Sequence, residues 1–575
     1  MQVSFAYAGR SAVVQPPGAR WQALSLVPNL TRDPVAFDAP LRQPLRFREA
    51  VSALHDTVVS DLRFKKRDKA AYHEWKKQQA GGDAALRRAA LAAATAEAAA
   101  RHGTAVPADL ERAYEQSRRR YWGARQKYSD YLRKNDPNLW RLLMPCDPVI
   151  TVGDDVVFLE CFSADESSYG CLTVARGEGF GRAEHVRVGT TNVDYSWDLY
   201  NHFQALRSYR ETRFRVDPAG FEVVTAGAAD YREEKIDLPN SWLRGFLQIQ
   251  AAMTMPAGRV TLSREAVYAV LAWYKRHKAR RSPRAIRFEL TNGQPPRLVL
   301  EPWEQAITSY GTRYDGPDVE PVRVWGGRRL TVLARLLPLA ERFDVYLLGT
   351  GLPSFWVAHM GEMRLTLGLS GWTVNDWTRS AALDLLAPPA APAPDTVDNV
   401  AAVVREQGRV EQPAIEQRLG IAPPVAAAAL RQLANAGQVI YDLVDGVYRW
   451  RQIMPKAVGQ AEIGPEHPEL AGARVLMERN RAELTSRQDA PDVSGAGAGG
   501  YVLGGNVESK PVEILVDADG RIRRGKCLCG YFRQYALKNG PCRHMLALRW
   551  RASAGALEAY RASSWYNRLR GRNAE

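Results

Sequence analysis

The chain has 575 residues, of which 46% are hydrophobic and 25% charged, a composition typical of a folded protein with several domains. A net charge of +15, from 78 Lys and Arg against 63 Asp and Glu, predicts that part of the surface meets an acidic partner. The sequence contains no run of about 18 apolar residues, which argues against a membrane span. It also lacks a basic start followed by an apolar run, which argues against a secretory signal. We therefore expect a cytoplasmic, multidomain α+β protein.

The positive charge is concentrated in two segments. Residues 61–134 hold 18 Lys and Arg against 9 Asp and Glu, and residues 501–575 hold 14 against 6, so the rest of the chain is close to neutral. Such an excess indicates two surfaces that contact DNA, RNA or an acidic protein. The alternative is an exposed face that is solvated and has no partner.

The first 135 residues divide into two parts. Residues 1–60 contain the short β-like runs QVSFAYA, SAVVQP and WQALSLV, followed by the amphipathic stretch REAVSALHDTVVSDLRF, which is typical of a helix. Residues 61–135 form a predicted basic helical arm. This arm breaks at Gly81-Gly82 and resumes after Pro107, with Asp109 in the first turn of the next helix.

Residues 136–388 alternate between predicted strands and helices and form a mixed α/β body. Strands are predicted at VITVGDDVVFLECF, RFELTNGQPPRLVLEPW, FDVYLLG, SFWVAHM and MRLTLGLS, and a hairpin at ETRFRVDPAGFEVV. Helices are predicted at WDLYNHFQALRSYR, LSREAVYAVLAWYKRHKAR and RRLTVLARLLPLAERF. The usual phosphate-loop, metalloprotease, hydrolase and dinucleotide-binding motifs are missing from this sequence, so no pattern here indicates catalysis.

Two groups of residues in the body are candidates for chemical sites. The three body cysteines, Cys146, Cys161 and Cys171, lie in apolar surroundings without paired spacing, which predicts ordinary buried side chains. Five acidic residues gather in one stretch: Asp154, Asp155, Glu160, Asp165 and Glu166. They are candidates for an active site in residues 136–388, but a solvated strand end is the favoured explanation.

A Pro/Ala-rich stretch, LAPPAAPAPDT at 386–396, predicts a linker, and residues 395–455 predict a compact domain. Three short helices end at Gly408, Gly420 and Gly437. The sequence VIYDLVDGVYRWR then alternates across an Asp445-Gly446 turn, which predicts a β-hairpin. Three short helices closed by a hairpin resemble a winged helix-turn-helix domain.

A DNA-reading winged helix presents polar and basic side chains from its third helix to the major groove. Here that helix begins with Pro424-Val425 and four alanines, and Val425, Leu430 and Leu433 are expected to face the core. Residues 395–451 carry six Arg against seven acidic residues, whereas phosphate binding needs the opposite balance. The sequence therefore favours a protein-docking or structural role for this domain.

The C-terminal part begins with a predicted flexible linker at residues 456–505, which is polar and then rich in Gly and Ala. Residues 506–575 follow as a small domain with a basic tail. The stretch VEILVDADGRIRRGKCLCG predicts a hairpin that turns at Asp519-Gly520 and returns to Cys527, and PCRHMLALRWRA predicts a helix from about Pro541 with Met545 and Leu548 facing inward.

Three cysteines and a histidine lie within this domain, at Cys527, Cys529, Cys542 and His544. Two ligands at the end of a hairpin and two at the start of a helix can converge on one ion, and three thiolates with one imidazole suit Zn²⁺ in a closed structural site. A domain this small gains folding free energy from the metal. The alternatives are a redox thiol pair, which usually has two residues between its cysteines, or accidental clustering.

Basic residues surround the predicted zinc site and are candidates for contact with nucleic acid or an acidic partner. They are Arg521, Arg523, Arg524, Lys526, Arg533, Lys538 and Arg543.

The spacing Cys-x-Cys-x12-Cys-x-His, with a hairpin before it and an apolar helix after it, resembles the SWIM zinc finger over about residues 500–552. The four ligand positions of that family fall on Cys527, Cys529, Cys542 and His544. The resemblance implies a module that binds DNA or proteins and does not catalyse a reaction. The whole chain also looks like large bacterial SWIM proteins encoded near MoxR-type AAA+ ATPases and von Willebrand A proteins, which implies partners of those two kinds.

These features predict a non-catalytic adaptor. Its zinc domain and basic helices are expected to engage nucleic acid or another acidic surface, and its body and winged helix to dock proteins. One alternative is a protein-only scaffold of an AAA+ ATPase-associated complex. The other is an enzyme with an unrecognised site in residues 136–388. The sequence makes no prediction about the oligomeric state.

Overall fold

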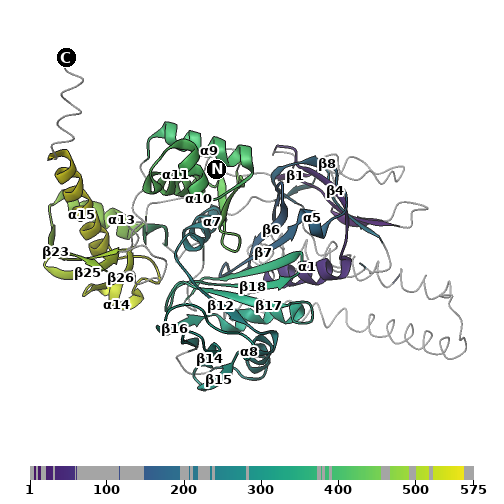
Figure 1. The fold of residues 1–575 in the computed structure, drawn as a ribbon, viewed down its shortest axis with the longest axis horizontal. Coiled ribbons are helices and arrows are strands. Elements are labelled where there is room, and N and C mark those ends of the chain that lie inside the picture. The colour runs from purple at the N-terminus through teal and green to yellow at the C-terminus, as the bar shows by residue number, and fades with distance from the viewer. Residues whose placement is uncertain are drawn as a thin grey trace, which may run out of the picture. The chain divides into compact units, whose positions relative to one another are not determined.

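The protein is described from a computed structural model (Figure 1). The described residues are 5–7, 11–14, 21–29, 33–58, 60, 116, 148–193, 206, 211–217, 233–235, 240–279, 284–371, 377, 383–386, 392–454, 467–490, 500–516 and 522–562. Met1–Asp61 and Cys146–Glu575 belong to one compact unit. The predicted basic arm at 61–135, the hairpin turn near Pro218 and the predicted helix at WDLYNHFQALRSYR lie outside the described residues, except for Gln116 and the buried Leu206.

The N-terminal strands do not form a separate domain, because a strand of the body completes their sheet. The five-stranded sheet runs in the order β2 (Ala12–Val14), β3 (Gln22–Leu26), β10 (Thr212–Val216), β4 (Ala36–Leu41) and β8 (Glu184–Arg187). Strand β10 lies parallel to β3 and antiparallel to β4. This sheet contains strands from both sides of the predicted boundary at residue 60, so the boundary does not separate two domains here. A further pair joins β1 (Phe5–Tyr7) to β11 (Glu233–Lys235).

An antiparallel eight-stranded sheet forms the centre of the body. Its order is β12 (Gly258–Leu262), β17 (Arg342–Leu347), β18 (Ser354–Met360), β19 (Met363–Leu369), β7 (Ser168–Ala175), β6 (Val156–Phe162), β5 (Val149–Val152) and β9 (Gly189–Asn192). The strands predicted from the sequence at β5, β6, β17, β18 and β19 are confirmed.

Both faces of the central sheet are covered. On β6, Val157 and Leu159 face one hydrophobic cluster and Phe158 and Phe162 face another, because successive side chains of a strand point to opposite faces. Helix α1 (Pro44–Val58) packs on β6 and β7 in the first cluster, and α7 (Asn240–Met253) belongs to the second. This double coverage explains why the strands appear in the sequence as continuous apolar runs.

A smaller sheet adjoins the body in the order β15 (Gln305–Thr308), β14 (Arg297–Leu300), β13 (Ala285–Leu290) and β16 (Val319–Trp325). Helix α8 (Arg264–Arg276) is confirmed at its predicted place. The segment RRLTVLARLLPLAERF, predicted as an α-helix, instead forms the 3-10 helix η1 (Gly327–Leu336). Its buried Leu330, Leu333 and Leu336 recur every three residues, which matches the three residues per turn of a 3-10 helix.

Residues 392–454 form a module of three short helices and a hairpin. The helices are α9 (Pro394–Gln407), α10 (Gln412–Leu419) and α11 (Pro423–Asn435), and the sheet order is β20 (Arg409–Val410), β22 (Val447–Trp450) and β21 (Val439–Asp442). Gly408 and Gly420 end their helices at positive φ, as predicted. Val425 was expected in the core but is 38% exposed, and Ala426 faces inward in its place, whereas Leu430 and Leu433 are buried as predicted.

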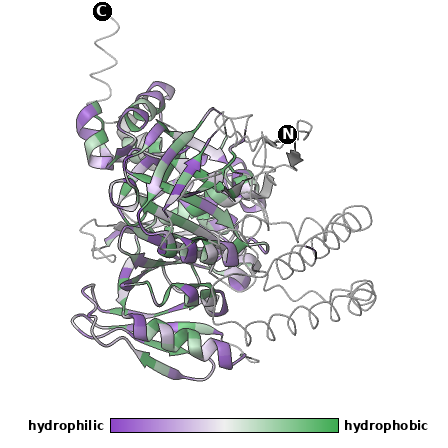
Figure 2. Cartoon of the chain, turned by 90° about the vertical axis from the view of Figure 1, so that its right-hand side faces the viewer, coloured by the Kyte–Doolittle hydropathy of each residue, from purple (hydrophilic) through white to green (hydrophobic). Residues whose placement is uncertain are grey.

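The flexible linker predicted at residues 456–505 is wrong over much of its length. Helix α13 (Pro468–Glu478) and strands β23 (Ala482–Ala490) and β24 (Gly500–Val507) lie within it. They complete the C-terminal domain with β25 (Lys510–Val516), β26 (Ile522–Cys527), α14 (Gly530–Tyr535) and α15 (Arg543–Ala562). Helix α15 packs on α13 and on the sheet. Figure 2 shows hydrophobic and hydrophilic residues alternating along the helices, as expected of amphipathic helices.

Composition was misleading in this segment because its polar residues belong to a paired strand and one of its glycines allows close packing. Most side chains of β23 face solvent, although its backbone pairs with β24. A Cβ at Gly505 would lie 2.4 Å from Leu548 Cδ1, so the glycine allows α15 to approach the sheet. Two short helices, α5 (Arg176–Gly179) and η2 (Leu383–Leu386), complete the described elements. Within the described part of the chain, no helix is long and apolar enough to cross a membrane.

Candidate metal centre

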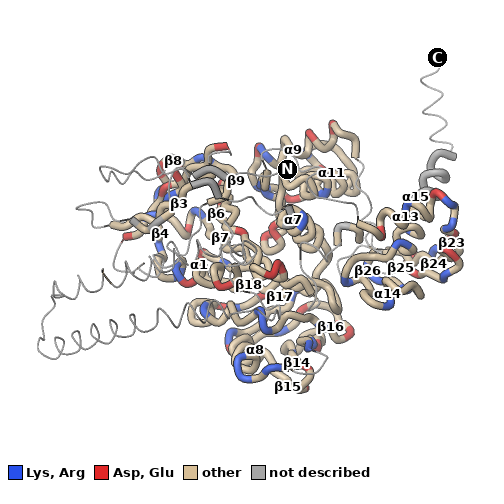
Figure 3. The backbone as a smooth tube through the Cα atoms, turned by 180° about the vertical axis from the view of Figure 1, so that it is seen from behind, with Lys and Arg blue, Asp and Glu red and all other residues tan. Residues whose placement is uncertain are grey.

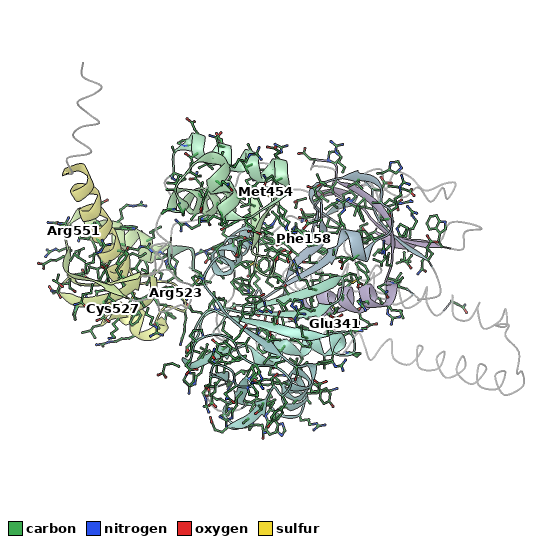
Figure 4. The ribbon with its side chains drawn as sticks, in the orientation of Figure 1. Phe158, Glu341, Met454, Arg523, Cys527 and Arg551 are labelled. Atoms are coloured by element: carbon green, nitrogen blue, oxygen red, sulfur yellow. The ribbon has the colours of Figure 1, made fainter. Side chains whose placement is uncertain are left out.

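The four predicted ligands lie at the ends of three neighbouring elements. Cys527 is the last residue of β26, and Cys529 caps the N-terminus of α14, where its Sγ accepts a hydrogen bond from the backbone N–H of Phe532 at 3.3 Å. Cys542 immediately precedes α15, and His544 lies in its first turn. The hairpin of β25 and β26 and the helix that follows were both predicted, and both are confirmed. Figure 4 labels Cys527 and Arg523 on this domain.

The ligand atoms of Cys527, Cys529, Cys542 and His544 all lie within 4.8 Å of one another, and all four residues are buried. A single buried thiol is ordinary, but three thiols that converge with an imidazole form the donor set of a metal site. This Cys₃His cluster can hold one metal ion, with all four ligands supplied by the protein.

The cluster also favours a thiolate. Hydrogen bonding from the Cys542 thiol lowers the pKa of Cys527 to about 4, and the same contact raises the pKa of Cys542. Burial raises the pKa of Cys529. Backbone N–H groups donate to the sulfurs at three places: Cys529 to Cys527, Phe532 to Cys529, and Met545 to Cys542. Such N–H···S bonds stabilise the charged sulfur that a metal requires.

The two nitrogens of His544 have different surroundings. Nε2 lies 3.3 Å from Oε2 of Glu508, in the turn between β24 and β25. Nδ1 is buried and has no hydrogen-bond partner among the described residues. Ligating histidines usually give their second nitrogen to a carboxylate. The geometry therefore assigns Nδ1 to the ion and Nε2 to Glu508.

A second carboxylate orders the start of α15. Glu469, buried in the first turn of α13, accepts hydrogen bonds from the backbone N–H of Arg543 at 2.7 Å and from its guanidinium at 2.6 Å. Burial opposes ionisation, but these hydrogen bonds lower the pKa of Glu469. Sequence analysis missed both Glu469 and Glu508, because neither has a spacing or a neighbour that links it to the cysteines.

The predicted basic contact residues fall into two groups. Arg523 donates to the carbonyl oxygen of Pro256 at 3.2 Å, Lys538 lies over the ring of Trp325 at 5.5 Å, and Arg543 pairs with Glu469. Burial lowers the pKa of Lys538. These three side chains therefore contribute to internal contacts.

Arg524, Lys526 and Arg533 are exposed. Lys526 is 80% exposed and pairs with Glu513 on the neighbouring strand at 3.2 Å. Arg521 lies outside the described residues.

The acidic stretch of the body was predicted to be a solvated strand end, and this prediction is wrong for most of its residues. Glu160 is fully buried against Arg451 of the three-helix module, and Asp155 pairs with Arg449 of the same hairpin. Asp165 is buried and accepts hydrogen bonds from the hydroxyls of Ser163 and Ser167, whereas Asp154 is exposed. Asp155, Glu160 and Asp165 thus have separate structural partners, and Glu166 is also buried.

The body cysteines behave as predicted where they are described. Cys161 and Cys171 are buried, and burial raises the pKa of Cys171 to about 12. Cys146 lies outside the described residues.

No protein-family model matches the chain, and no curated protein matches it. Among solved structures, it is similar to the Proliferating Cellular Nuclear Antigen of Entamoeba histolytica, at 14% identity over 39% of this chain and 88% of that one. It is also similar to A. fulgidus PCNA bound to the C-terminal region of FEN-1, at 11% identity over 41% and 94% of the two chains. A third is the PCNA2–PCNA3 complex of Sulfolobus tokodaii, at 9% identity over 39% and 89%. The TM-score is 0.27 in each case, which is too low to indicate the fold or the function of this protein.

Proposed function

We propose that the protein is a zinc-dependent, non-catalytic adaptor whose C-terminal domain, a SWIM-type zinc finger, binds nucleic acid. The observation that carries this proposal is the closed Cys₃His cluster, in which four buried side chains converge and a carboxylate orients the histidine. Three thiolates and one imidazole suit zinc, and a fully protein-ligated ion is structural, because no position is left for water or substrate.

The exposed side of β26 supports the choice of ligand. Arg524 and Lys526 of β26, and Leu528 just after it, alternate with more buried residues, so they lie in a row on one face. Arg533 is exposed on α14, four residues after Cys529 and before Cys542. This row, together with Arg533, can contact a phosphate backbone and the surface next to it. It offers positive side chains to the phosphates and one apolar side chain beside them.

The module of residues 392–454 is proposed to be a winged helix that docks internally. Arg449 of β22 pairs with Asp155, just before β6, and Arg451, just after β22, pairs with Glu160 of β6. Asp442 of β21 pairs with Arg364 of β19 at 2.6 Å. A hairpin tied to the body in this way cannot also lie along DNA. This favours the structural role that its alanine-rich third helix suggests.

Metal content tests the first half of the proposal. We expect one zinc per chain by elemental analysis of the purified full-length protein, and loss of hydrogen-exchange protection in the C-terminal domain after chelation. His544→Ala should have the same effect as chelation. Protein with no stoichiometric metal, or a domain equally protected in the variant, would contradict the zinc site.

Salt-dependent binding of a labelled oligonucleotide tests the second half. Replacing Arg524, Lys526 and Arg533 with Gln should lower the slope of log affinity against log salt by about 2 to 3 if all three contact phosphates, without releasing zinc. Glu513→Gln is the matched control, and it should tighten binding because it frees Lys526. An unchanged slope in the triple variant would exclude this row as the contact. If the protein binds no oligonucleotide but retains a protein partner after nuclease treatment, the scaffold alternative is favoured.

A further inference from the structure

Helix α8 of the body presents a basic and aromatic face to solvent. Its buried side is made by Ala266, Val267, Val270, Leu271 and Tyr274. Arg264, Tyr268 and Lys275 are exposed and form one row beside the buried side, because positions i, i+4 and i+11 align on a helix with 3.6 residues per turn. This row extends over about 16 Å of helix.

The positive charge of this helix has little compensation. Arg264 pairs with Glu265 at 3.6 Å, but both side chains are at least half exposed, and such pairs are weak. Lys275, Arg276 and Lys278 are exposed, and within the described part of the chain no carboxylate lies within 4 Å of them.

In the neighbouring sheet of β13 to β16, by contrast, the positive side chains are paired. Its three cations are matched by three carboxylates, in the pairs Arg287–Glu304, Arg297–Glu289 and Arg323–Glu301. The uncompensated charge of this region is therefore concentrated on α8, and Figure 3 shows Lys and Arg recurring along that helix. The net charge of the whole body hides this concentration because it is close to zero, although the run KRHKARR at 275–281 is basic in the sequence itself.

Aromatic rings accompany these cations. Tyr268 is 59% exposed at the middle of the row. Tyr310 is 76% exposed and directly follows Ser309, whose Oγ accepts a hydrogen bond from the backbone N–H of Ser263 at the start of α8. Exposed aromatic rings beside cations offer flat faces on which unpaired bases can stack.

The C-terminal end of the helix adds a preformed aromatic stack. The rings of Trp273 and His277 are parallel at 3.9 Å, and Trp303 meets them edge-on at 5.9 and 6.0 Å. Two of its rings, Trp273 and His277, belong to the same short stretch of sequence as Lys275, Arg276 and Lys278. Cations that follow a backbone, with rings that can stack on bases, are the combination found in proteins that bind single strands.

We propose that this α8 face, made of Arg264, Tyr268, Lys275, Arg276, Lys278 and Tyr310, is a second nucleic-acid surface and binds single-stranded nucleic acid. It rests on the proposed function, in that the C-terminal domain and the α8 face take the same class of ligand. The cations contact phosphates, and Tyr268 and Tyr310 stack on unpaired bases, whose faces a duplex hides.

Fluorescence anisotropy with the zinc-loaded full-length protein and a labelled oligothymidylate tests the α8 face. Lys275→Gln/Arg276→Gln/Lys278→Gln should reduce the salt slope by about 2. Tyr268→Ala should weaken binding by about 5- to 100-fold at constant salt slope. Glu265→Gln is the matched control and should tighten binding, because it removes the negative charge of the face. All of these side chains are exposed, so the melting temperature should not change.

The outcomes separate the two surfaces. If the C-terminal triple variant weakens binding and the α8 variants do not, the α8 face is overturned and the proposed function stands. If only the α8 variants weaken binding, the α8 face stands and the C-terminal contact falls. Failure of the wild-type protein to bind oligothymidylate, or tighter binding of a duplex of the same length, overturns the α8 proposal.

Discussion

The buried ion pair between Arg451 and Glu160 joins the three-helix module to the central sheet, and its removal should loosen both. Both side chains are 0% exposed, with Nε of Arg451 3.1 Å from Oε2 of Glu160. The Tyr169 hydroxyl donates to Oε1 of Glu160 at 2.7 Å, and the ring of Phe246 lies 5.0 Å from the guanidinium carbon of Arg451. Water therefore has no access to replace a lost partner.

Arg451→Met removes the cation and leaves the carboxylate buried with only Tyr169 as its partner. Breaking a buried pair on one side costs about 3 to 5 kcal/mol, whereas replacing both partners with apolar groups of similar size is often close to neutral. We therefore expect Arg451→Met to destabilise the junction by about 3 to 5 kcal/mol. The double variant Glu160→Leu/Arg451→Met should recover most of this loss.

The single variant should also depend on pH. Burial already raises the pKa of Glu160, and losing Arg451 raises this pKa further. The folded variant then binds a proton more readily than the unfolded chain, so its stability falls as the pH rises from the unfolded pKa towards the folded pKa. Arg451→Met should therefore be less damaging in mild acid than at neutral pH.

Hydrogen exchange of the full-length protein, followed at the amides of β6 and β22, measures the local free energy of opening. The matched control is Arg418→Gln, which removes an exposed ion pair with Glu406 in the same module and should cost less than about 1 kcal/mol. Equal protection in Arg451→Met and in the wild type would refute the reasoning. So would a double variant as unstable as the single one.

Three further predictions concern other parts of the chain. Glu508→Gln should lower metal affinity by about 10- to 100-fold in a chelator competition while the circular dichroism is retained; unchanged affinity would show that Glu508 does not orient the histidine. Burial alone would raise the pKa of Asp344, but the hydrogen bond from His359 lowers it from 3.8 to about 2, so this pair should lose its stabilising effect as the pH falls from about 4 to 2. An acid titration of Asp344→Asn should lack this step, and a step of the same size would argue against the pair. Gly505→Ala should destabilise the C-terminal domain by about 1 to 3 kcal/mol in thermal unfolding, because its Cβ has no room. Gly177→Ala, which meets nothing within 4 Å, should be neutral, and equal effects of the two would contradict the packing argument.

The metal centre could be predicted largely from the sequence, because its information is local. Cys527, Cys529, Cys542 and His544 fall within one short segment, and the strand and helix that carry them follow from alternation and helical periodicity. The helices ending at Gly408 and Gly420 were predicted for the same reason, since a positive φ leaves a visible signal in the residue type.

Several features were decided only by the tertiary structure. Strand β10 enters the N-terminal sheet from 190 positions away, as the hydrogen bond from Gln22 to Thr212 shows, and no local pattern specifies that partner. In the predicted linker, polar residues of β23 belong to a strand because the neighbouring strand pairs with its backbone, which composition does not record.

The acidic stretch shows the same limit most clearly. The sequence by itself determined that Glu160 lies on a strand, but not that Arg451, 291 positions later, lies against it. A carboxylate in water and a carboxylate buried on an arginine have the same letter in the sequence, and their energies differ only through what the fold places beside them. Residue type and spacing therefore determined which side chains could bind a metal, whereas the fold decided which charges are paired in the interior and which, as on α8, face the solvent.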